Sequence, residues 1–231
     1  MNAPATITTP VTHASLATTL LAAADRIEHA LKHHVDRTAL VVGMSGIDGS
    51  GKSHLSAELA RILQDRGLRV ALIGVDPWQN PQSIRFGGPD PGIHFCRHCI
   101  RFDDFFAEVI EPLRSTRALQ LRTRGMPTAT DDDFELIYDF RNVQIVLVEG
   151  ILLFRRESVA RFDFRIWVDC SFATALHRAV SRNVEELPVD RLEADYRAIY
   201  HAAQHHHLDR DAPIAAAHFI LNNDTLLETR T

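Results

Sequence analysis

The stretch that decides the fold is Gly46-Ile47-Asp48-Gly49-Ser50-Gly51-Lys52-Ser53, which matches the pattern G-x-x-x-x-G-K-[ST]. The apolar residues 39–42 precede it and are predicted to form a buried strand. Residues 52–66 follow it with apolar side chains on one helical face, and Gly67 is a typical helix stop. A glycine-rich turn can match such a pattern by chance. The flanking strand and helix nevertheless favour a phosphate-binding loop.

The residue types of this loop suit the binding of nucleotide phosphates. Glycines let backbone N–H groups converge on phosphate oxygens, and the following helix adds the partial positive charge of its N-terminus. We expect Lys52 to reach the β- and γ-phosphates and Ser53 to ligate Mg²⁺. The predicted nucleotide contacts are Gly46, Asp48, Gly49, Ser50, Gly51, Lys52 and Ser53. The sequence therefore predicts a nucleotide-binding protein.

Strand and helix patterns alternate along the rest of the chain, which predicts a parallel α/β sheet covered on both faces. A first helix is expected over residues 14–33. The further predicted strands are residues 70–75, 145–148, 164–168 and 218–221, and the further helices lie around 102–113, 172–180 and 192–200. Residues 76–94 are predicted to be a long loop, and residues 119–138 fit neither period clearly. We expect a flexible tail over residues 1–13 and one domain over 14–231.

Composition narrows the classes of protein. The chain has 231 residues, of which 45% are apolar and 24% charged, so a wholly disordered chain is excluded. Its 25 Lys and Arg against 30 Asp and Glu give a net charge of −5, which argues against a nucleic-acid-binding surface. No apolar run approaches the roughly 20 residues of a membrane span. Three cysteines suggest reduced thiols in a cytoplasmic protein.

Two acidic residues follow predicted strands and are the candidates for chemistry. In an open parallel sheet, ligands bind outside the carboxyl ends of the strands. Asp76 ends the second strand and is the candidate general base, whereas Glu149 ends the third and is the candidate for the Mg²⁺ shell. The alternative is that each acid only caps a turn. Asp169 also ends a strand, and there we expect a helix N-cap.

Arg178 and Arg182 are four residues apart and so lie on one helical face. They could stabilise the charge on a transferring phosphoryl group. The segment Glu185-Glu186-Leu187-Pro188 then breaks the helix, and a helix–break–helix unit of this kind could form a lid. A solvated basic face is the alternative.

With these residues identified, the chain resembles the uridine kinase-like branch of P-loop kinases, which also includes phosphoribulokinase and pantothenate kinase. The resemblance runs from about Leu40 to Asp224. It rests on Gly43-Met44-Ser45 before the loop, Asp76, Val148-Glu149-Gly150-Ile151-Leu152, Phe164-Arg165-Ile166-Trp167-Val168-Asp169, the helix carrying Arg178 and Arg182, residues 196–204, and Ile220-Leu221-Asn222-Asn223-Asp224.

The resemblance implies an ATP- and Mg²⁺-dependent small-molecule kinase, with a five-stranded parallel sheet of order 2-3-1-4-5 and a helical lid. It maps the family's acid after strand two onto Asp76, its Mg²⁺-associated glutamate onto Glu149, and its lid arginines onto Arg178 and Arg182. Two features depart from the family. Tyr138-Asp139 lies too close to Glu149 to be the Tyr-Asp pair of nucleoside-phosphorylating members, and Asn183 stands where relatives often have Asp.

Two histidine-rich runs invite a metal interpretation that their spacing does not favour. The run His94-Phe95-Cys96-Arg97-His98-Cys99 lacks the two separated ligand pairs of a structural zinc site. We expect it beside an acceptor site, with Trp78, Arg85 and His94 as acceptor contacts. Residues 205–207 are consecutive histidines, which do not share a helical face, so a solvated helix end is favoured over a metal site.

Three functions remain open at this stage. The first is a kinase that transfers the ATP γ-phosphate to a hydroxyl of a nucleoside, sugar or vitamin-type acceptor. Such a kinase could form a homo-oligomer. The second is a regulatory or chaperone-type P-loop NTPase with water as the acceptor. A GTPase needs an Asn-Lys-x-Asp guanine reader, and Asn222-Asn223-Asp224 lacks the lysine. The third is a binding module without turnover, which the joint presence of Lys52 and both strand-end acids disfavours.

Overall fold

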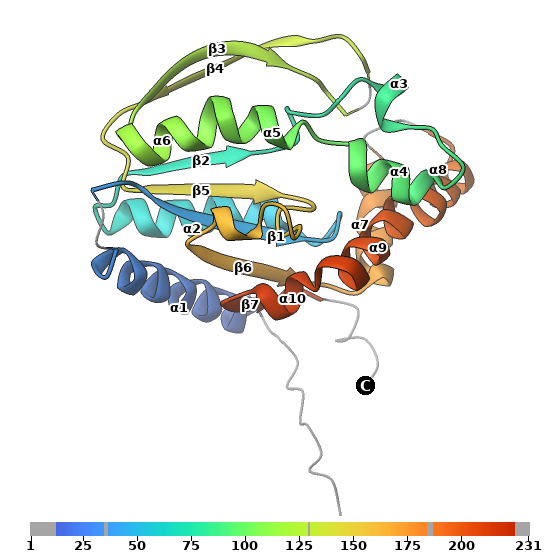
Figure 1. Cartoon of the computed structure of the whole chain (residues 1–231). Helices are drawn as coiled ribbons and strands as arrows, with labels where there is room; N and C mark the ends of the chain where they lie inside the picture. The colour runs from blue at the N-terminus through green and yellow to red at the C-terminus, as the bar shows by residue number, and fades with distance from the viewer. Residues whose placement is uncertain (1–12, 35–36, 129, 184–186, 225–231) are drawn as a thin grey trace, which may run out of the picture.

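The fold is built on a five-stranded parallel sheet (Figure 1). The computed structural model describes residues 13–34, 37–128, 130–183 and 187–224. The strands are β1 (Leu40–Gly46), β2 (Val70–Gly74), β5 (Ile145–Gly150), β6 (Phe164–Asp169) and β7 (Phe219–Asn222), in the order β2-β5-β1-β6-β7. Counted among themselves, these strands have the predicted order 2-3-1-4-5. The labels differ because β3 and β4 form a separate hairpin.

Two hydrophobic cores cover the two faces of the sheet, because successive strand residues point to opposite sides. In β1, Val42 and Met44 pack with α1 (His13–Lys32) and α2 (Lys52–Asp65), whereas Val41 belongs to the opposite core. That second core includes the helical segment of α5 (Phe102–Phe105), the π-helical turn η1 (Phe106–Ile110) and α6 (Glu111–Thr116). The three-layer arrangement predicted from the alternating elements is confirmed.

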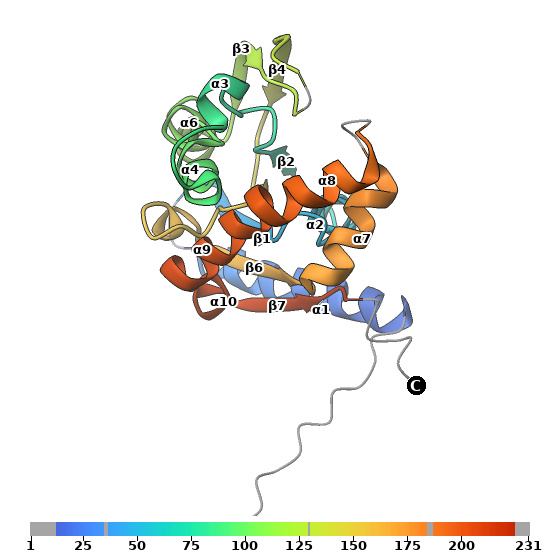
Figure 2. The ribbon, with the colours of Figure 1, turned by 90° about the vertical axis from the view of Figure 1, so that its right-hand side faces the viewer.

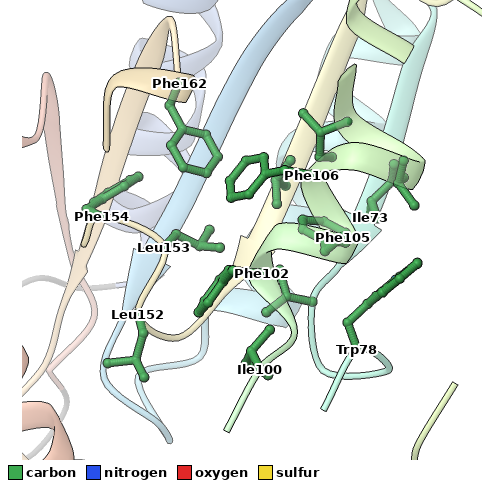
Figure 3. Packing of buried hydrophobic residues seen from close by; sticks show 14 of the residues in the cluster. Ile73, Trp78, Ile100, Phe102, Phe105, Phe106, Leu152, Leu153, Phe154 and Phe162 are labelled. Carbon is green, nitrogen blue, oxygen red and sulfur yellow. The ribbon is translucent and has the colours of Figure 1, made fainter. Parts of the chain in front are cut away.

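An aromatic cluster holds the segment after β5 against the α5–η1 helix (Figure 3). Phe106 contacts Phe162 with ring centroids 5.8 Å apart, and Phe162 contacts Phe154 at 5.5 Å. A 3-10 turn, η2 (Val159–Arg161), leads into β6. This packing fixes the chain that leaves the sheet after Gly150, next to Glu149.

Residues 119–138, whose sequence fits neither period clearly, form most of an antiparallel hairpin of β3 (Leu119–Gly125) and β4 (Phe134–Phe140). The hairpin is a separate two-stranded sheet that lies beyond the α5–α6 helix (Figure 1). Both strands alternate between partly buried and exposed residues over most of their length.

The prediction of a continuous loop over residues 76–94 is wrong. The short helix α3 (Gln82–Arg85) lies inside it, and α4 (Pro91–His98) begins before its end. The Asp90 side chain accepts a hydrogen bond from the Ile93 N–H at 2.9 Å, and Pro91 occupies the first turn, so α4 has a well-formed N-terminus. These helices are too short to give a readable apolar period.

Between β6 and β7, the described residues are mostly helical. Its elements are α7 (Phe172–Arg182), α8 (Val189–Asp195), the π-helical turn η3 (Tyr196–His201), α9 (Ala202–Asp211) and α10 (Pro213–Ala216). Figure 2 shows α7 and α8 side by side next to the end of the sheet. Ser171, whose Oγ accepts from the Thr174 N–H at 3.2 Å, caps α7. The N-cap expected at Asp169 is therefore wrong, because α7 begins three residues after β6 ends.

Two expectations fall partly outside the described residues: the tail, and the helix break at Glu185-Glu186-Leu187-Pro188, of which Leu187 and Pro188 are described. The tail predicted over residues 1–13 lies outside the described residues except for His13, which begins α1. The described helices include none with the length and apolarity needed to cross a bilayer.

Candidate active site

The phosphate loop connects β1 to α2 at the carboxyl edge of the sheet, in a backbone conformation that requires glycine. Gly49 and Gly51 have φ values of 78° and 88°, in the left-handed region. A Cβ atom at Gly49 would lie 2.5 Å from the Ala175 carbonyl oxygen, and one at Gly51 would collide with the Asn223 amide. Both glycines are thus required by conformation and by close approach.

A cavity of about 460 Å³ opens above this loop, and we call it the phosphate-loop cavity. Residues from the loop, the end of β2 and α7 surround it. The predicted site residues that line it are Asp48, Gly49, Gly51, Lys52, Ser53, Asp76, Arg178 and Arg182. Gly46, Ser50 and Glu149 do not line it. Gly46 is a buried β1 residue, and the Ser50 carbonyl accepts from Arg178 at 3.3 Å.

Lys52 lies at the start of α2, with only 5% of its surface exposed. Its Nζ donates a long hydrogen bond of 3.4 Å to the Ile47 carbonyl, which turns the ammonium back over the loop. Among the described residues this is its one hydrogen bond, and although the carboxylates of Asp48, Asp76 and Glu149 interact with the same charge, its other N–H groups can donate to an anionic ligand.

Ser53 and Glu149 form an oxygen-rich pair at the same edge. The Ser53 Oγ donates to Glu149 Oε2 at 3.0 Å. Glu149 lies opposite Gly74 in the β2–β5 register, and a Cβ atom at Gly74 would lie 2.9 Å from Glu149 Oε1. Burial raises the pKa of Glu149, with a further contribution from Asp76, while Lys52 opposes the rise.

The donor set of Ser53 and Glu149 fits Mg²⁺, which prefers oxygen ligands and usually keeps phosphate oxygens and water in its shell. Within the described residues, no three His, Cys, Asp or Glu side chains lie together as a metal site. A metal at this edge would therefore complete its coordination with water or with ligand phosphates.

Asp48 connects the phosphate loop to the C-terminal helices. Its Oδ2 accepts from the Tyr196 hydroxyl at 2.6 Å, and its Oδ1 accepts from the Gly49 N–H at 3.0 Å. Burial alone would raise the pKa of Asp48, but the charge of Lys52 and the Tyr196 hydrogen bond hold it below its ordinary value. Asp48 is thus a fixed anion at neutral pH.

Asp76 faces the cavity from the end of β2. Surrounding protein raises the pKa of Asp76 by desolvation, and the neighbouring Asp48 charge adds to this, while Lys52 and Arg182 limit the rise. A carboxylate with a raised pKa, next to a cavity and to cations, is a suitable proton acceptor.

The two arginines of α7 differ in their surroundings. The Arg178 guanidinium donates to the Gly49 and Ser50 carbonyls and, at 2.9 Å, to the Asn223 carbonyl, so it braces the loop. Arg182 lies near the end of α7, exposed, and its charge acts on both Asp48 and Asp76.

A second, smaller cavity of about 70 Å³ adjoins the first and shares Asp48 and Asp76 with it. We call it the side cavity. Its lining comes from five separate segments of the chain and includes Gln79, Arg85, Thr128, Tyr196, Tyr200 and Gln204.

Of the three expected acceptor contacts, the structure brings only Arg85 to the side cavity. Trp78 is completely buried in the core, where its Nε1 donates to the Tyr138 hydroxyl at 2.9 Å. His94 Nε2 lies 2.9 Å from the Ile84 carbonyl oxygen, and its ring packs on His98. Neither side chain lines either cavity.

Several lining residues were not recognised from the sequence, above all Tyr196, Gln204 and Gln79. The sequence predicts Tyr196 only as part of the helix around residues 192–200. Nothing in the sequence pairs it with Asp48, from which it is separated by 148 residues.

The two positions that depart from the family pattern also have defined structural partners. Tyr138 points into the core, and the exposed Asp139 pairs with Arg141, so neither lines the described cavities. The Asn183 side chain donates to the Leu187 carbonyl at 2.9 Å and accepts from the Leu187 N–H at 3.1 Å.

Comparison with known proteins agrees with this geometry. The family model described as methylmalonyl Co-A mutase-associated GTPase MeaB matches residues 10–89, the part that contains β1, the loop, α2 and β2. A uridine kinase from Leuconostoc citreum is 25% identical over 170 residues, which cover 70% of this chain and 80% of that protein.

Two solved structures have the same fold. A possible uridine kinase from Bacillus stearothermophilus superimposes with a TM-score of 0.64 at 19% identity, covering 85% of this chain and 97% of that one. A protein assigned as a fructose transport system kinase from Silicibacter sp. TM1040 gives 0.64 at 21% identity, covering 87% and 98%.

The fold and the loop together place the chain in the class of proteins with the P-loop kinase fold. Within that class, the resemblance to the uridine kinase-like branch is confirmed.

Proposed function

We propose that this protein is an ATP-dependent kinase that transfers the γ-phosphoryl group to a hydroxyl of a small acceptor. The observation that carries the proposal is the position of Asp76, which lines both the phosphate-loop cavity and the side cavity. A carboxylate shared by the two cavities can contact an acceptor hydroxyl on one side and face a phosphate on the other.

In this mechanism the loop backbone, Lys52 and the two α7 arginines bind and orient the triphosphate. Ser53 and Glu149 would hold Mg²⁺, which supplies charge neutralisation on the phosphates when it is bound. The acceptor oxygen forms a bond to the γ-phosphorus, and its proton passes to Asp76. The bond between the γ-phosphorus and the bridging oxygen breaks, and ADP leaves with that electron pair.

Asp76→Asn tests this role directly. We expect ATP binding within about twofold of wild type and turnover lower by about 10²-fold or more, because the amide cannot accept the proton. The measurement is acceptor-dependent ADP formation, with titration of ATP binding alongside it. Unchanged turnover would remove Asp76 from this role.

A second function, a P-loop NTPase that hydrolyses nucleotide with water as acceptor, is favoured by one observation, the MeaB match over residues 10–89. The residues nearest to a guanine reader have other partners. The Asn223 amide donates to the Ser50 carbonyl at 2.7 Å, and Asp224 accepts from the Ser171 N–H at 3.0 Å.

A screen of nucleosides, sugars, hydroxy acids and pantothenate, each with ATP and with GTP, separates the two functions. The kinase predicts ADP formation that depends on an acceptor, together with a phosphorylated product seen by mass spectrometry. Nucleotide hydrolysis that no acceptor stimulates would favour the NTPase.

A further inference from the structure

The side cavity contains a buried positive charge, that of Arg85, which has no counter-ion among the described residues. Arg85 is only 1% exposed, yet no carboxylate in the described part of the chain lies within 4.0 Å of its guanidinium. Its terminal nitrogens donate to neutral groups, the side-chain oxygen of Gln79 and, at 3.0 Å, the Thr128 carbonyl. Its Nε is buried and has no hydrogen-bond partner.

An arrangement of this kind destabilises the fold of a protein that binds nothing there. Burial of a charge without a partner has a large desolvation penalty, and a neutral residue at this position would avoid it. The surroundings of Arg85 also include the ring of Phe86 at 5.2 Å and the more distant charge of Asp131. An anionic ligand would supply the missing counter-ion.

A second unsatisfied group lies in the same cavity. Gln204 is 1% exposed, and its Oε1 is buried without a hydrogen-bond partner. An amide oxygen in this state can accept a hydrogen bond from a ligand hydroxyl. A ligand with one anionic group and one hydroxyl could therefore pair with both Arg85 and Gln204.

The charges are arranged so that a ligand with two different ends would fit. The acids Asp48 and Asp76 belong to the part shared with the phosphate-loop cavity, whereas Arg85 belongs to the side cavity alone. An anionic end at Arg85 would leave an uncharged hydroxyl for the Asp76 side. The volume of about 70 Å³ is far below the roughly 300–1,000 Å³ of cavities for drug-sized ligands.

We infer that the acceptor is a small hydroxy compound carrying a carboxylate or a phosphate monoester, and that Arg85 binds this anionic group while Gln204 accepts a hydrogen bond from a second hydroxyl. The inference rests on the proposed kinase function. It makes Arg85 a specificity-determining residue and disfavours a neutral nucleoside as the acceptor.

The test compares four acceptors: glycerol, glycerate, glycerol 3-phosphate and uridine. The first three share a carbon skeleton and differ in the anionic group. For the wild-type protein we expect kcat/KM to be about 10- to 100-fold higher with glycerate or glycerol 3-phosphate than with glycerol. The two anionic arms distinguish a carboxylate from a phosphate. Equal or better use of uridine or glycerol would overturn the inference and leave the kinase function intact.

Variants connect the preference to Arg85. In Arg85→Gln the preference for the anionic acceptor should disappear, in Arg85→Lys it should be partly retained, and the KM for ATP should stay within about twofold in both. Because Arg85 is buried, Gln204→Glu serves as a second variant, since it introduces a negative charge into the side cavity with little change in volume. It should weaken use of the anionic acceptor about tenfold and affect glycerol less.

Binding gives a readout that does not depend on turnover. Glycerate or glycerol 3-phosphate should raise the thermal unfolding midpoint of the wild-type protein and not that of Arg85→Gln. If no acceptor is phosphorylated but this stabilisation is seen, the kinase function fails and the anion site stands. If there is neither transfer nor stabilisation, both fail.

Discussion

The phosphate-loop cavity and the side cavity are built in different ways. Much of the first comes from one short stretch, residues 48–54, whose glycines, lysine and serine are positioned by a single strand–loop–helix unit. The second is assembled from residues between Asp48 and Gln204 that lie on several short helices and connections. One cavity follows from a local rule and the other from tertiary packing.

The difference matches the chemistry that each side would perform. Triphosphates are alike in all nucleotides, so one backbone geometry can serve every member of a fold class. Acceptors differ in size and charge, and their binding side chains come from connections that change without disturbing the sheet. Asp76, Asp48 and Tyr196 join the two sides, since the tyrosine bonds Asp48 across the structure.

The largest expected effect on activity comes from a change in the phosphate-loop cavity. Lys52→Met keeps an apolar stem and removes the charge, and we expect turnover to fall about 10³-fold with weaker ATP binding. Steady-state kinetics and ATP titration measure the two effects. Lys32→Met, which changes the exposed lysine of α1, is the matched control and should match wild type. A mild defect in Lys52→Met would show that the loop backbone alone binds the phosphates.

Arg182→Gln tests how the two sides communicate through charge. We expect turnover to fall about 10²-fold near pH 8, because a cation beside the phosphates is lost. The positive charge of Arg182 lowers the pKa of Asp76, so its removal should raise that pKa. Asp76 must be deprotonated to act as a base. The loss of activity on acidification should therefore begin at a higher pH in the variant.

The pH dependence of kcat, measured for both proteins, checks this sign. Arg191→Gln, which changes an exposed arginine paired with Asp195 on α8, is the control and should leave the acidic limb where it is in wild type. An acidic limb that moves to lower pH in Arg182→Gln would contradict Asp76 as the titrating group.

The sequence predicts the phosphate-loop cavity better than the side cavity. Asp76 and Glu149 were placed by the rule that parallel strands end at one edge, and the register sets Glu149 opposite Gly74 at the end of β2. Trp78 lies only two residues after Asp76, yet it points into the core. An irregular connection has no period that would give the direction of a side chain.

The hairpin was missed for a related reason. Its strands alternate in burial, as a period of two requires, but three consecutive aspartates, residues 131–133, lie in the connection between them and disfavour a strand reading of the whole stretch. The bond between Asp48 and Tyr196 joins residues 148 positions apart, and only the fold brings them together.

Tyr196→Phe should have a moderate effect, because it removes one hydrogen bond to a charged carboxylate. We expect the free energy of unfolding to fall by about 1–2 kcal/mol and turnover to fall by less than about tenfold. Denaturant unfolding and kinetics provide the two numbers. Tyr138→Phe removes a hydroxyl that bonds Trp78 in the core, so it should change stability alone. Equal kinetics in the two variants would show that the Asp48–Tyr196 bond does not join the sides functionally.

The smallest expected effect on activity is that of Trp78→Phe. The indole is completely buried, packs edge-on to Phe105 at 5.6 Å and donates to Tyr138, so the smaller ring should cost about 1–3 kcal/mol of stability. Because Trp78 lines neither cavity, the KM for the acceptor should stay within about twofold of wild type. His94→Ala should likewise leave that KM unchanged, since His94 lies outside both cavities. A tenfold rise in acceptor KM for either variant would mean that the acceptor side extends beyond the side cavity, toward α4 or the core under β2.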